Sequence, residues 1–128
     1  MRKFDKAAAE SKVVGPIDVT RWEQFGLNAA VPFQAMWYTV PPLSASVLDR
    51  HPELELSIVI SGAADVESIE SGSFTPVVAG DGFLFDTEEG HIIHNRSETE
   101  PVTIFAAYWM PTGTPLDGPA EKLEEAAQ

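Results

Sequence analysis

The sequence predicts an all-β fold, either a closed barrel or a sandwich. Its central part consists of short runs of β-branched and aromatic residues, and turn signals such as Ser-Gly and Gly-Asp-Gly interrupt these runs every several positions. This spacing is typical of barrels and sandwiches and not of βαβ units. At 128 residues the chain has the length of one domain with a single core. We therefore expect one all-β domain over residues 1–128.

Each expected strand is a run of β-forming residues that stops at a turn signal. Pro41-Pro42 ends the first aromatic run, and Pro111 ends the longest apolar run. These strands define an expected barrel core over about residues 33–110. The expected strands are 33–40, 54–60, 63–69, 74–78, 83–85, 90–95 and 102–110.

Short helical segments are expected at both ends of the chain. The N-terminal arm, 1–30, begins with a charged, Ala-rich stretch that favours a short helix or a frayed end. Thr20 and Glu23 have the spacing of a capping box at a helical turn. The C-terminal tail, 111–128, finishes with an acidic segment that resembles a short helix.

Composition excludes several classes of partner. The net charge of −12 repels phosphate backbones and anionic membrane surfaces, so we expect neither nucleic-acid nor membrane binding. No apolar run approaches the ~20 residues of a membrane helix. The absence of cysteine excludes disulfides and thiolate ligands. Together with an N-terminus that lacks an apolar signal core, these features favour the cytoplasm.

The strand at 54–60 has an unusual distribution of side chains. Leu54, Leu56, Ile58 and Ile60 lie on one face, whereas the other face carries Glu55 and Ser57. If the polar face lines a barrel interior, the apolar face needs a cover. A second sheet, the N-terminal segment or a second subunit could provide it, and we expect a homodimer.

The histidines fall in two short segments. Asp49, His51 and Glu55 have the same parity, so an extended backbone places them on one face. His91 follows about forty residues later, and His94 has the opposite parity to it. This is the pattern of a metal site assembled from neighbouring strands.

The first histidine segment resembles the first motif of the cupin superfamily, G(X)5HXH(X)3,4E(X)6G. His51, Glu55 and Gly62 match its second histidine, its glutamate and its final glycine. Asp49 stands in place of the first histidine, and Leu43 stands in place of the first glycine.

The second segment resembles the second cupin motif, G(X)5PXG(X)2H(X)3N. Gly80, His91 and Asn95 match, while Asp86 replaces the proline and Glu88 replaces the inner glycine. The resemblance covers roughly residues 33–110 and implies a small jelly-roll β-barrel that holds one metal ion.

The resemblance implies that His51, Glu55 and His91 hold a divalent metal ion. Asp49 is a fourth ligand, a partner that orients His51, or a turn residue. Two imidazoles and one carboxylate with open positions are the facial set of non-haem Fe(II), and we favour that ion. Zn, Mn and Ni suit the same donors. Glu55 and Asp49 are also the candidate catalytic bases.

Same-face residues of neighbouring strands would form an apolar, aromatic pocket around this site. Arg50 and Arg96 are candidates to pair with an anionic substrate, or they point to solvent. The candidate pocket residues are Trp37 or Tyr38, Phe83 or Phe85, Tyr108 or Trp109, and Asn95.

These features favour a mononuclear metal-dependent enzyme acting on an apolar or aromatic small molecule. An oxygenase-type reaction and Lewis-acid chemistry, as in an isomerase or cyclase, both suit the implied ligands. The alternatives are a non-catalytic cupin that binds a small molecule and a metal-free barrel with a structural role.

Overall fold

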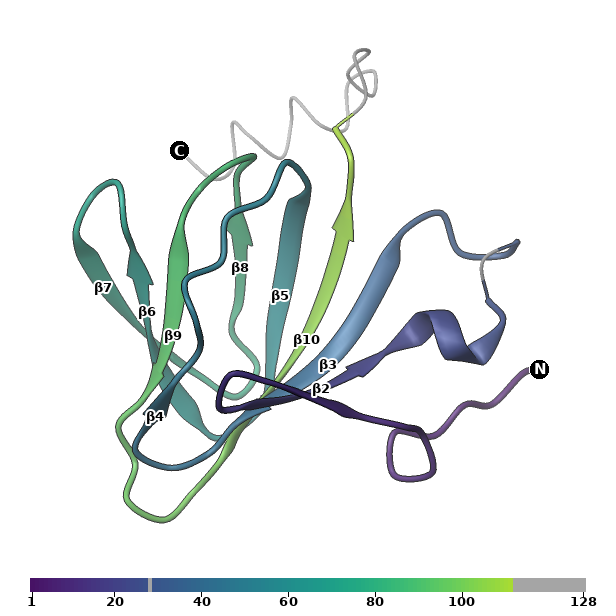
Figure 1. Ribbon diagram of the computed structural model, residues 1–128, viewed down its shortest axis with the longest axis horizontal. Coiled ribbons are helices and arrows are strands. Elements are labelled where there is room, and N and C mark those ends of the chain that lie inside the picture. Colours follow the sequence, from purple (N-terminus) through teal and green to yellow (C-terminus); the bar gives the residue numbers. More distant parts are fainter. Residues whose placement is uncertain (28, 112–128) are drawn as a thin grey trace.

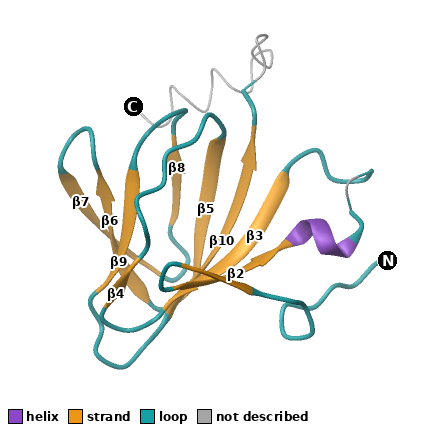
Figure 2. Ribbon diagram, in the orientation of Figure 1, coloured by secondary structure: helices purple, strands orange, loops and turns teal. Residues whose placement is uncertain are grey.

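Two antiparallel β-sheets face each other in this protein, as seen in a computed structural model that describes residues 1–27 and 29–111 (Figures 1 and 2). The larger sheet has the order β1-β2-β3-β10-β5-β8, and the smaller has the order β4-β9-β6-β7. The strands are β1 (Lys12–Val14), β2 (Ile17–Arg21), β3 (Gln34–Val40), β4 (Ser44–Ala45), β5 (Leu54–Ser61), β6 (Ala63–Ser68), β7 (Ser73–Val78), β8 (Gly82–Phe85), β9 (His91–Asn95) and β10 (Val102–Trp109). The all-β prediction is confirmed.

The hydrophobic core lies between the two sheets. Val40 and Val102 are paired across β3 and β10 in the larger sheet, and both are fully buried. Ile93 reaches the same core from β9 of the smaller sheet. Alternation along each strand supplies these residues, because every second side chain of a strand points to the same face.

The prediction of a short helix in the first residues of the chain is wrong, whereas the expected helical turn is present just after Thr20. Among the described residues the only helix is η1 (Trp22–Phe25), a single 3-10 turn whose N-cap, Arg21, makes no side-chain capping bond. Residues 1–11 contain only turns, since so short a segment gains little from helix formation in water. Thr20 lies inside β2, so the expected capping box does not form. The predicted C-terminal helix lies outside the described residues.

No helix within the described ranges is both long and apolar enough to span a membrane.

The polar face of β5 points into the space between the sheets. Glu55 and Ser57 are buried there, whereas the side chains of Leu56, Ile58 and Ile60 point outward with exposed fractions of 39%, 37% and 53%. Most strands of soluble proteins bury their apolar face, so β5 is inverted. The inversion places a carboxylate inside the barrel and an apolar row outside it.

An aromatic cluster covers part of this outer surface. Phe4 of the N-terminal arm packs against Trp22 with ring centroids 4.8 Å apart, and against Trp37 of β3 at 6.0 Å. Trp22 also packs against Phe105 of β10 at 5.1 Å. The N-terminal arm therefore covers β3 and β10, while the outer faces of β5 and β8 keep their apolar side chains exposed.

Candidate metal centre

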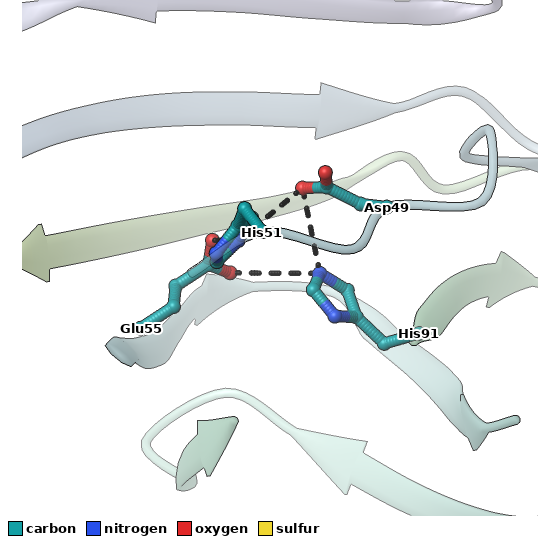
Figure 3. A group of neighbouring side chains, drawn as sticks. All are labelled: Asp49, His51, Glu55 and His91. Carbon is teal, nitrogen blue, oxygen red and sulfur yellow. Dashed lines mark hydrogen bonds and ion pairs between the residues drawn. The ribbon is translucent and has the colours of Figure 1, made fainter. Parts of the chain in front are cut away.

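Four side chains with metal-binding chemistry meet inside the barrel (Figure 3). Glu55 projects from β5 and His91 from β9, while Asp49 and His51 belong to the segment that precedes β5. One potential ligand atom from each residue lies within 4.8 Å of all the others. The structure thus brings together the four residues that the sequence places in two separate segments.

Backbone pairing fixes the position of the segment that carries Asp49. The amide of Asp49 donates to the carbonyl of His91, and the amide of His91 donates back, both at 3.0 Å. The amide of Glu88 also donates to the carbonyl of His51, at 2.8 Å. The segment before β5 is therefore tied to the loop before β9, and this connection aligns the two halves of the site.

The potential ligand atoms lie within 3.1–3.9 Å of one another in four pairs. His51 Nε2 lies 3.1 Å from Glu55 Oε1, and His91 Nε2 lies 3.9 Å from Glu55 Oε2. Asp49 Oδ2 lies 3.6 Å from Nε2 of both histidines. Asp49 is therefore placed symmetrically between the two imidazoles and can act as a fourth ligand.

The backbone sets the tautomer of both histidines. His51 Nδ1 lies 3.0 Å from the carbonyl oxygen of Glu53, and His91 Nδ1 lies 3.1 Å from that of Glu89. A carbonyl oxygen only accepts, so each Nδ1 must carry the hydrogen, and in a neutral ring Nε2 then has a free lone pair. Two lone pairs and two carboxylates converge, and such a set of acceptors could hold a cation.

The charges of the cluster shift the pKa values of its members. The interaction with His91 lowers the pKa of Asp49. Burial raises the pKa of Glu55, although both imidazoles oppose this effect. Burial acts to lower the pKa of His91, but contact with Asp49 and the charge of Glu55 outweigh burial and raise it. Without a metal, the cluster therefore favours a proton on His91.

Neighbouring side chains orient the ligands. The ring of Phe85 stacks on that of His91, with centroids 3.7 Å apart and planes inclined by 5°. Ser57 Oγ donates to Glu55 Oε2 at 3.3 Å. Such contacts around the ligands commonly fix their geometry and tune metal affinity. Burial, with the negative charges of Glu55 and Asp49, raises the pKa of Tyr38 well above its ordinary value, so its phenol stays protonated.

A cavity of about 150 Å³ opens onto the cluster. Tyr38, Asp49, Glu55 and His91 line it together with Arg21, which the sequence analysis did not select. The sequence does contain a signal for Arg21. Ile17, Val19 and Arg21 have the same parity, so an extended strand places all three on one face. The capping-box spacing of Thr20 and Glu23 predicts a helical turn that includes Arg21, whereas in the structure Arg21 is the last residue of β2.

The other candidate pocket residues have different places. Trp37 lies in the outer aromatic cluster, since it has the opposite parity to Tyr38 on β3. Phe83 packs against the core and Phe85 against His91. Asn95 is buried but supports a turn, because its amide group donates to the carbonyls of Val40 and Glu100.

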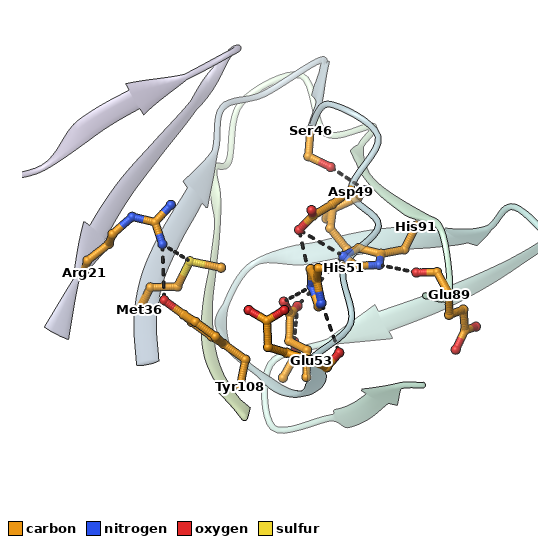
Figure 4. Close-up of polar contacts among 12 residues, drawn as sticks. Arg21, Met36, Ser46, Asp49, His51, Glu53, Glu89, His91 and Tyr108 are labelled. Atoms are coloured by element: carbon orange, nitrogen blue, oxygen red, sulfur yellow. Dashed lines mark hydrogen bonds and ion pairs between the residues drawn. The ribbon is translucent and has the colours of Figure 1, made fainter. Parts of the chain in front are cut away.

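Tyr108 lies beside the cavity and contacts one of its lining residues. Its hydroxyl accepts a hydrogen bond from Arg21 Nη1 at 3.2 Å (Figure 4). The same hydroxyl donates to Glu23 Oε1 at 3.4 Å.

The remaining charged candidates form ion pairs away from the cavity. Arg50 pairs with Glu70, and Arg96 Nε lies 2.6 Å from Asp65 Oδ2. His94 points to the opposite side from His91, as its parity predicts, and its Nε2 lies 2.8 Å from the carboxylate of Glu67. None of these three residues lines the cavity at the cluster.

Comparison with known proteins agrees with this geometry. The sequence profile of the Cupin domain matches residues 36–108, which include all four cluster residues. The chain belongs to the cupin family. The family resemblance and its fold are thereby confirmed, and this cupin has an aspartate where the first motif has its first histidine. No curated protein matched the sequence.

Solved structures with diverse names share the fold of this cupin. The plu4264 protein from Photorhabdus luminescens is 26% identical, with a TM-score of 0.69 over 100% of this chain and 98% of the other. The polyketide cyclase RemF from Streptomyces resistomycificus is 13% identical, with a TM-score of 0.73 over 97% and 93%. The Cupin_2 domain of an XRE family transcriptional regulator from Enterobacter cloacae is 19% identical, with a TM-score of 0.63 over 76% and 99%. The last two show the fold alone.

Proposed function

We propose that this cupin is a metal-dependent enzyme that acts on a small molecule in the barrel cavity. His51, Glu55 and His91 would hold one divalent ion, with Asp49 as a fourth ligand. The convergence of four acceptor groups within 4.8 Å, with both imidazoles oriented by backbone carbonyls, carries this proposal. The nitrogen and oxygen donors suit Fe(II), which we favour, as well as Zn, Mn and Ni.

Different residues of the chain would have different roles in the reaction. A bound ion supplies Lewis acidity and, if it is iron, the capacity to react with O2. Asp49 is more exposed than Glu55, with exposed side-chain fractions of 47% and 2%, so it is the carboxylate better placed to exchange protons with solvent. The protonated phenol of Tyr38 lines the cavity and can donate a hydrogen bond to a substrate oxygen. Apolar residues of the walls exclude water from the reacting atoms.

A Lewis-acid reaction, such as an isomerisation or cyclisation, and an oxygenation both suit this arrangement. The fold likeness to a protein named a polyketide cyclase supports the first only as an analogy. A non-catalytic cupin that binds a small molecule is the second candidate. The fold likeness to a domain of a transcriptional regulator favours it in the same limited way.

Elemental analysis of the untagged protein tests the metal site. We expect about one metal ion per chain in the wild type and its loss in His91→Ala. His94→Ala is the matched control, because His94 lies on the same strand but faces Glu67 outside the cluster. If anaerobic incubation with Fe(II), Mn(II), Ni(II) or Zn(II) leaves the wild type without metal, the enzyme proposal is wrong.

We also propose that a second copy of the chain covers the outer apolar patch formed by Leu56, Ile58, Ile60 and Leu84. These side chains are exposed on β5 and β8, and Leu56 and Leu84 are paired neighbours in the sheet. The patch carries no charge in a chain of net charge −12, so it is a surface where two copies can meet without placing carboxylates against each other.

An outer groove extends this patch towards the N-terminal region. Its volume is about 990 Å³, and apolar residues including Phe33, Leu56, Trp109 and Met110 line it. A partner that covers the patch could also fill this groove, which would enlarge the apolar contact beyond the four patch residues.

A further inference from the structure

We propose that the barrel cavity selects a small organic carboxylate, and that Arg21 binds the carboxylate group across the cavity from the metal cluster. The inference deepens the proposed function and rests on it, since it assumes a metal ion between Asp49, Glu55 and the two histidines. It assigns a substrate class and a specificity residue to the same site.

Arg21 and the cluster belong to different walls of one cavity. Arg21 ends β2, whereas Asp49 and His91 lie on the opposite side in Figure 4, and all three line the same space. The guanidinium group is held from one side only. Its Nη1 donates to the hydroxyl of Tyr108 at 3.2 Å and lies 4.0 Å from the sulfur of Met36.

The charge of Arg21 is not neutralised by a neighbouring carboxylate. Arg50 and Arg96 each form an ion pair, but no carboxylate of residues 1–27 or 29–111 lies within 4.0 Å of Arg21. Within the same residues, the side-chain hydrogen bonds of Arg21 involve Nη1 alone. A guanidinium group presents further N–H donors in a planar fork that matches the two oxygens of a carboxylate.

The other residues that line the cavity allow the charge of Arg21 to select an anionic ligand. Among the residues that the structure describes, Arg21 is the only lysine or arginine that lines the cavity, and many of the other lining residues are apolar, among them Ile17, Val19 and Ile93. Asp49 and Glu55 repel an anion unless a divalent ion offsets their charges. With the ion in place, the two carboxylates no longer repel an anion, and Arg21 keeps the other end of the cavity positive, which suits a molecule with an oxygen ligand at one end and a carboxylate at the other.

The cavity volume limits the size of this molecule. A space of about 150 Å³ is comparable to one that holds benzene in another protein. We therefore choose benzoate as the charged probe and benzamide as its uncharged counterpart, because the two have nearly the same shape. Neither is offered as the natural substrate.

Calorimetric titration of the Zn-loaded protein tests the inference. We expect benzoate to bind more tightly than benzamide to the wild type. We expect Arg21→Ala to weaken benzoate binding by about tenfold or more, since a charge-assisted hydrogen bond is lost, while benzamide binding stays within about twofold. Arg21→Lys should retain part of the preference for benzoate. Arg96→Ala is the control, because it removes a cation that pairs with Asp65 outside the cavity.

The zinc content of each sample separates the two proposals. If the wild type holds zinc and benzoate either fails to bind or binds equally well to Arg21→Ala, the carboxylate inference is wrong and the metal site remains. If zinc is absent but benzoate binding still depends on Arg21, the anion site remains and the metal proposal falls. If neither zinc nor benzoate binds, both fail. Thermal unfolding and zinc content of Arg21→Ala and Arg21→Lys show whether each variant is folded.

Discussion

At the scale of single residues, Asp49 is the member of the cluster whose role sequence reasoning left open. Its carboxylate lies 3.6 Å from Nε2 of both histidines, and backbone bonds with His91 fix its position. This symmetric placement favours a metal ligand over a turn residue or a partner of His51 alone. The position that holds a histidine in the first cupin motif thus still offers a donor atom, although it is oxygen instead of nitrogen.

Asp49→Asn tests this role, because it preserves size and removes the charge. We expect metal affinity to fall by roughly 10- to 100-fold, less than in His91→Ala. Competition titration with a chromophoric chelator measures the affinity, and Asp65→Asn, outside the cluster, provides the control. Unchanged affinity in Asp49→Asn would show that Asp49 is not a ligand.

The raised pKa of His91 predicts how the metal-free protein responds to pH. The folded state binds the His91 proton more tightly than the unfolded state, so this contribution to stability is complete below the ordinary value of 6.5 and is lost as pH rises through the folded-state pKa. The raised pKa of Glu55 also lowers the stability of the folded state as pH rises above 4.5, the ordinary pKa of a glutamate. The lowered pKa of Asp49 has the opposite effect, because it lowers stability as pH falls below 3.8, the ordinary pKa of an aspartate.

We therefore expect the EDTA-treated protein to melt at a lower temperature at about pH 8 than at about pH 6. The general repulsion of an acidic chain also grows with pH, so His91→Asn serves as the comparison. Differential scanning calorimetry should show a smaller change between the two pH values in this variant. An equal change in both proteins would contradict the assignment to His91.

At the scale of elements, two motif departures keep the backbone geometry of the glycines that they replace. Leu43 and Glu88 are the only described residues other than glycine with positive φ, at 56° and 62°. This left-handed conformation is one that glycine adopts without steric cost. Sequence comparison finds two missing glycines, while the structure shows that the turns they form are still present.

Replacing Glu88 with glycine should therefore stabilise the protein. The strain of about 1 kcal/mol at a left-handed residue is relieved, and the greater flexibility of the unfolded chain offsets part of the gain, so we expect about 0.5 kcal/mol. Urea unfolding measures the difference. Glu98→Gly makes the same change in an exposed loop without positive φ and should destabilise. A loss of stability in Glu88→Gly would contradict this explanation.

The glycine between β5 and β6 is needed for a second reason. Gly62 has φ of 83°, and a Cβ there would overlap the carbonyl oxygen of Pro101 and lie 2.9 Å from the Cα of Val102. Gly62→Ala should cost at least about 2 kcal/mol of unfolding free energy. Gly72 has φ of 68° with no atom near its Cβ position, so Gly72→Ala should cost about 1 kcal/mol. Equal costs, measured by urea unfolding, would contradict the role assigned to Pro101.

Parity along strands explains how much of the site could be predicted from the sequence. Parity predicts that Asp49, His51 and Glu55 lie on one face and that His94 points away from His91. Both predictions depend only on local backbone geometry. It could not choose between Trp37 and Tyr38, because that choice depends on which face of the sheet lies inside. Arg21 was missed because the capping-box spacing of Thr20 and Glu23 indicated a helical turn there, whereas Arg21 is the last residue of β2.

The helical prediction failed for a related reason. Composition describes what a segment favours in isolation, whereas the N-terminal arm is stabilised by packing Phe4 against Trp22 of η1 and Trp37 of β3. Such long-range contacts leave no local pattern. Asp86 shows the same limit, because its amide donates to Glu89 Oε1, a bond that the proline of the motif could not make.

At the scale of the whole molecule, the homodimer proposal makes a direct prediction. The wild type should have twice the mass of the chain in size-exclusion chromatography with light scattering, and Leu56→Lys should be monomeric because it places a charge in an apolar contact. Val78→Lys changes an exposed residue of the smaller sheet and should remain dimeric. A monomeric wild type at micromolar concentration would contradict the proposal.

If the wild type is monomeric, a variant that ends at residue 111 shows whether the tail covers the patch. Dimerisation of that variant would indicate that the C-terminal segment occupies the surface formed by Leu56, Ile58, Ile60 and Leu84.

The aromatic cluster has a consequence for spectroscopy. Trp22 and Trp37 have ring centroids 5.3 Å apart with planes inclined by 57°, a geometry in which the indole transitions couple and give circular dichroism in the near ultraviolet. Both rings belong to the contact between the N-terminal arm and the sheet, whereas the histidine cluster lies on the other side of that sheet. The protein therefore carries an intrinsic optical signal for detachment of the arm, and this signal can be followed separately from metal binding.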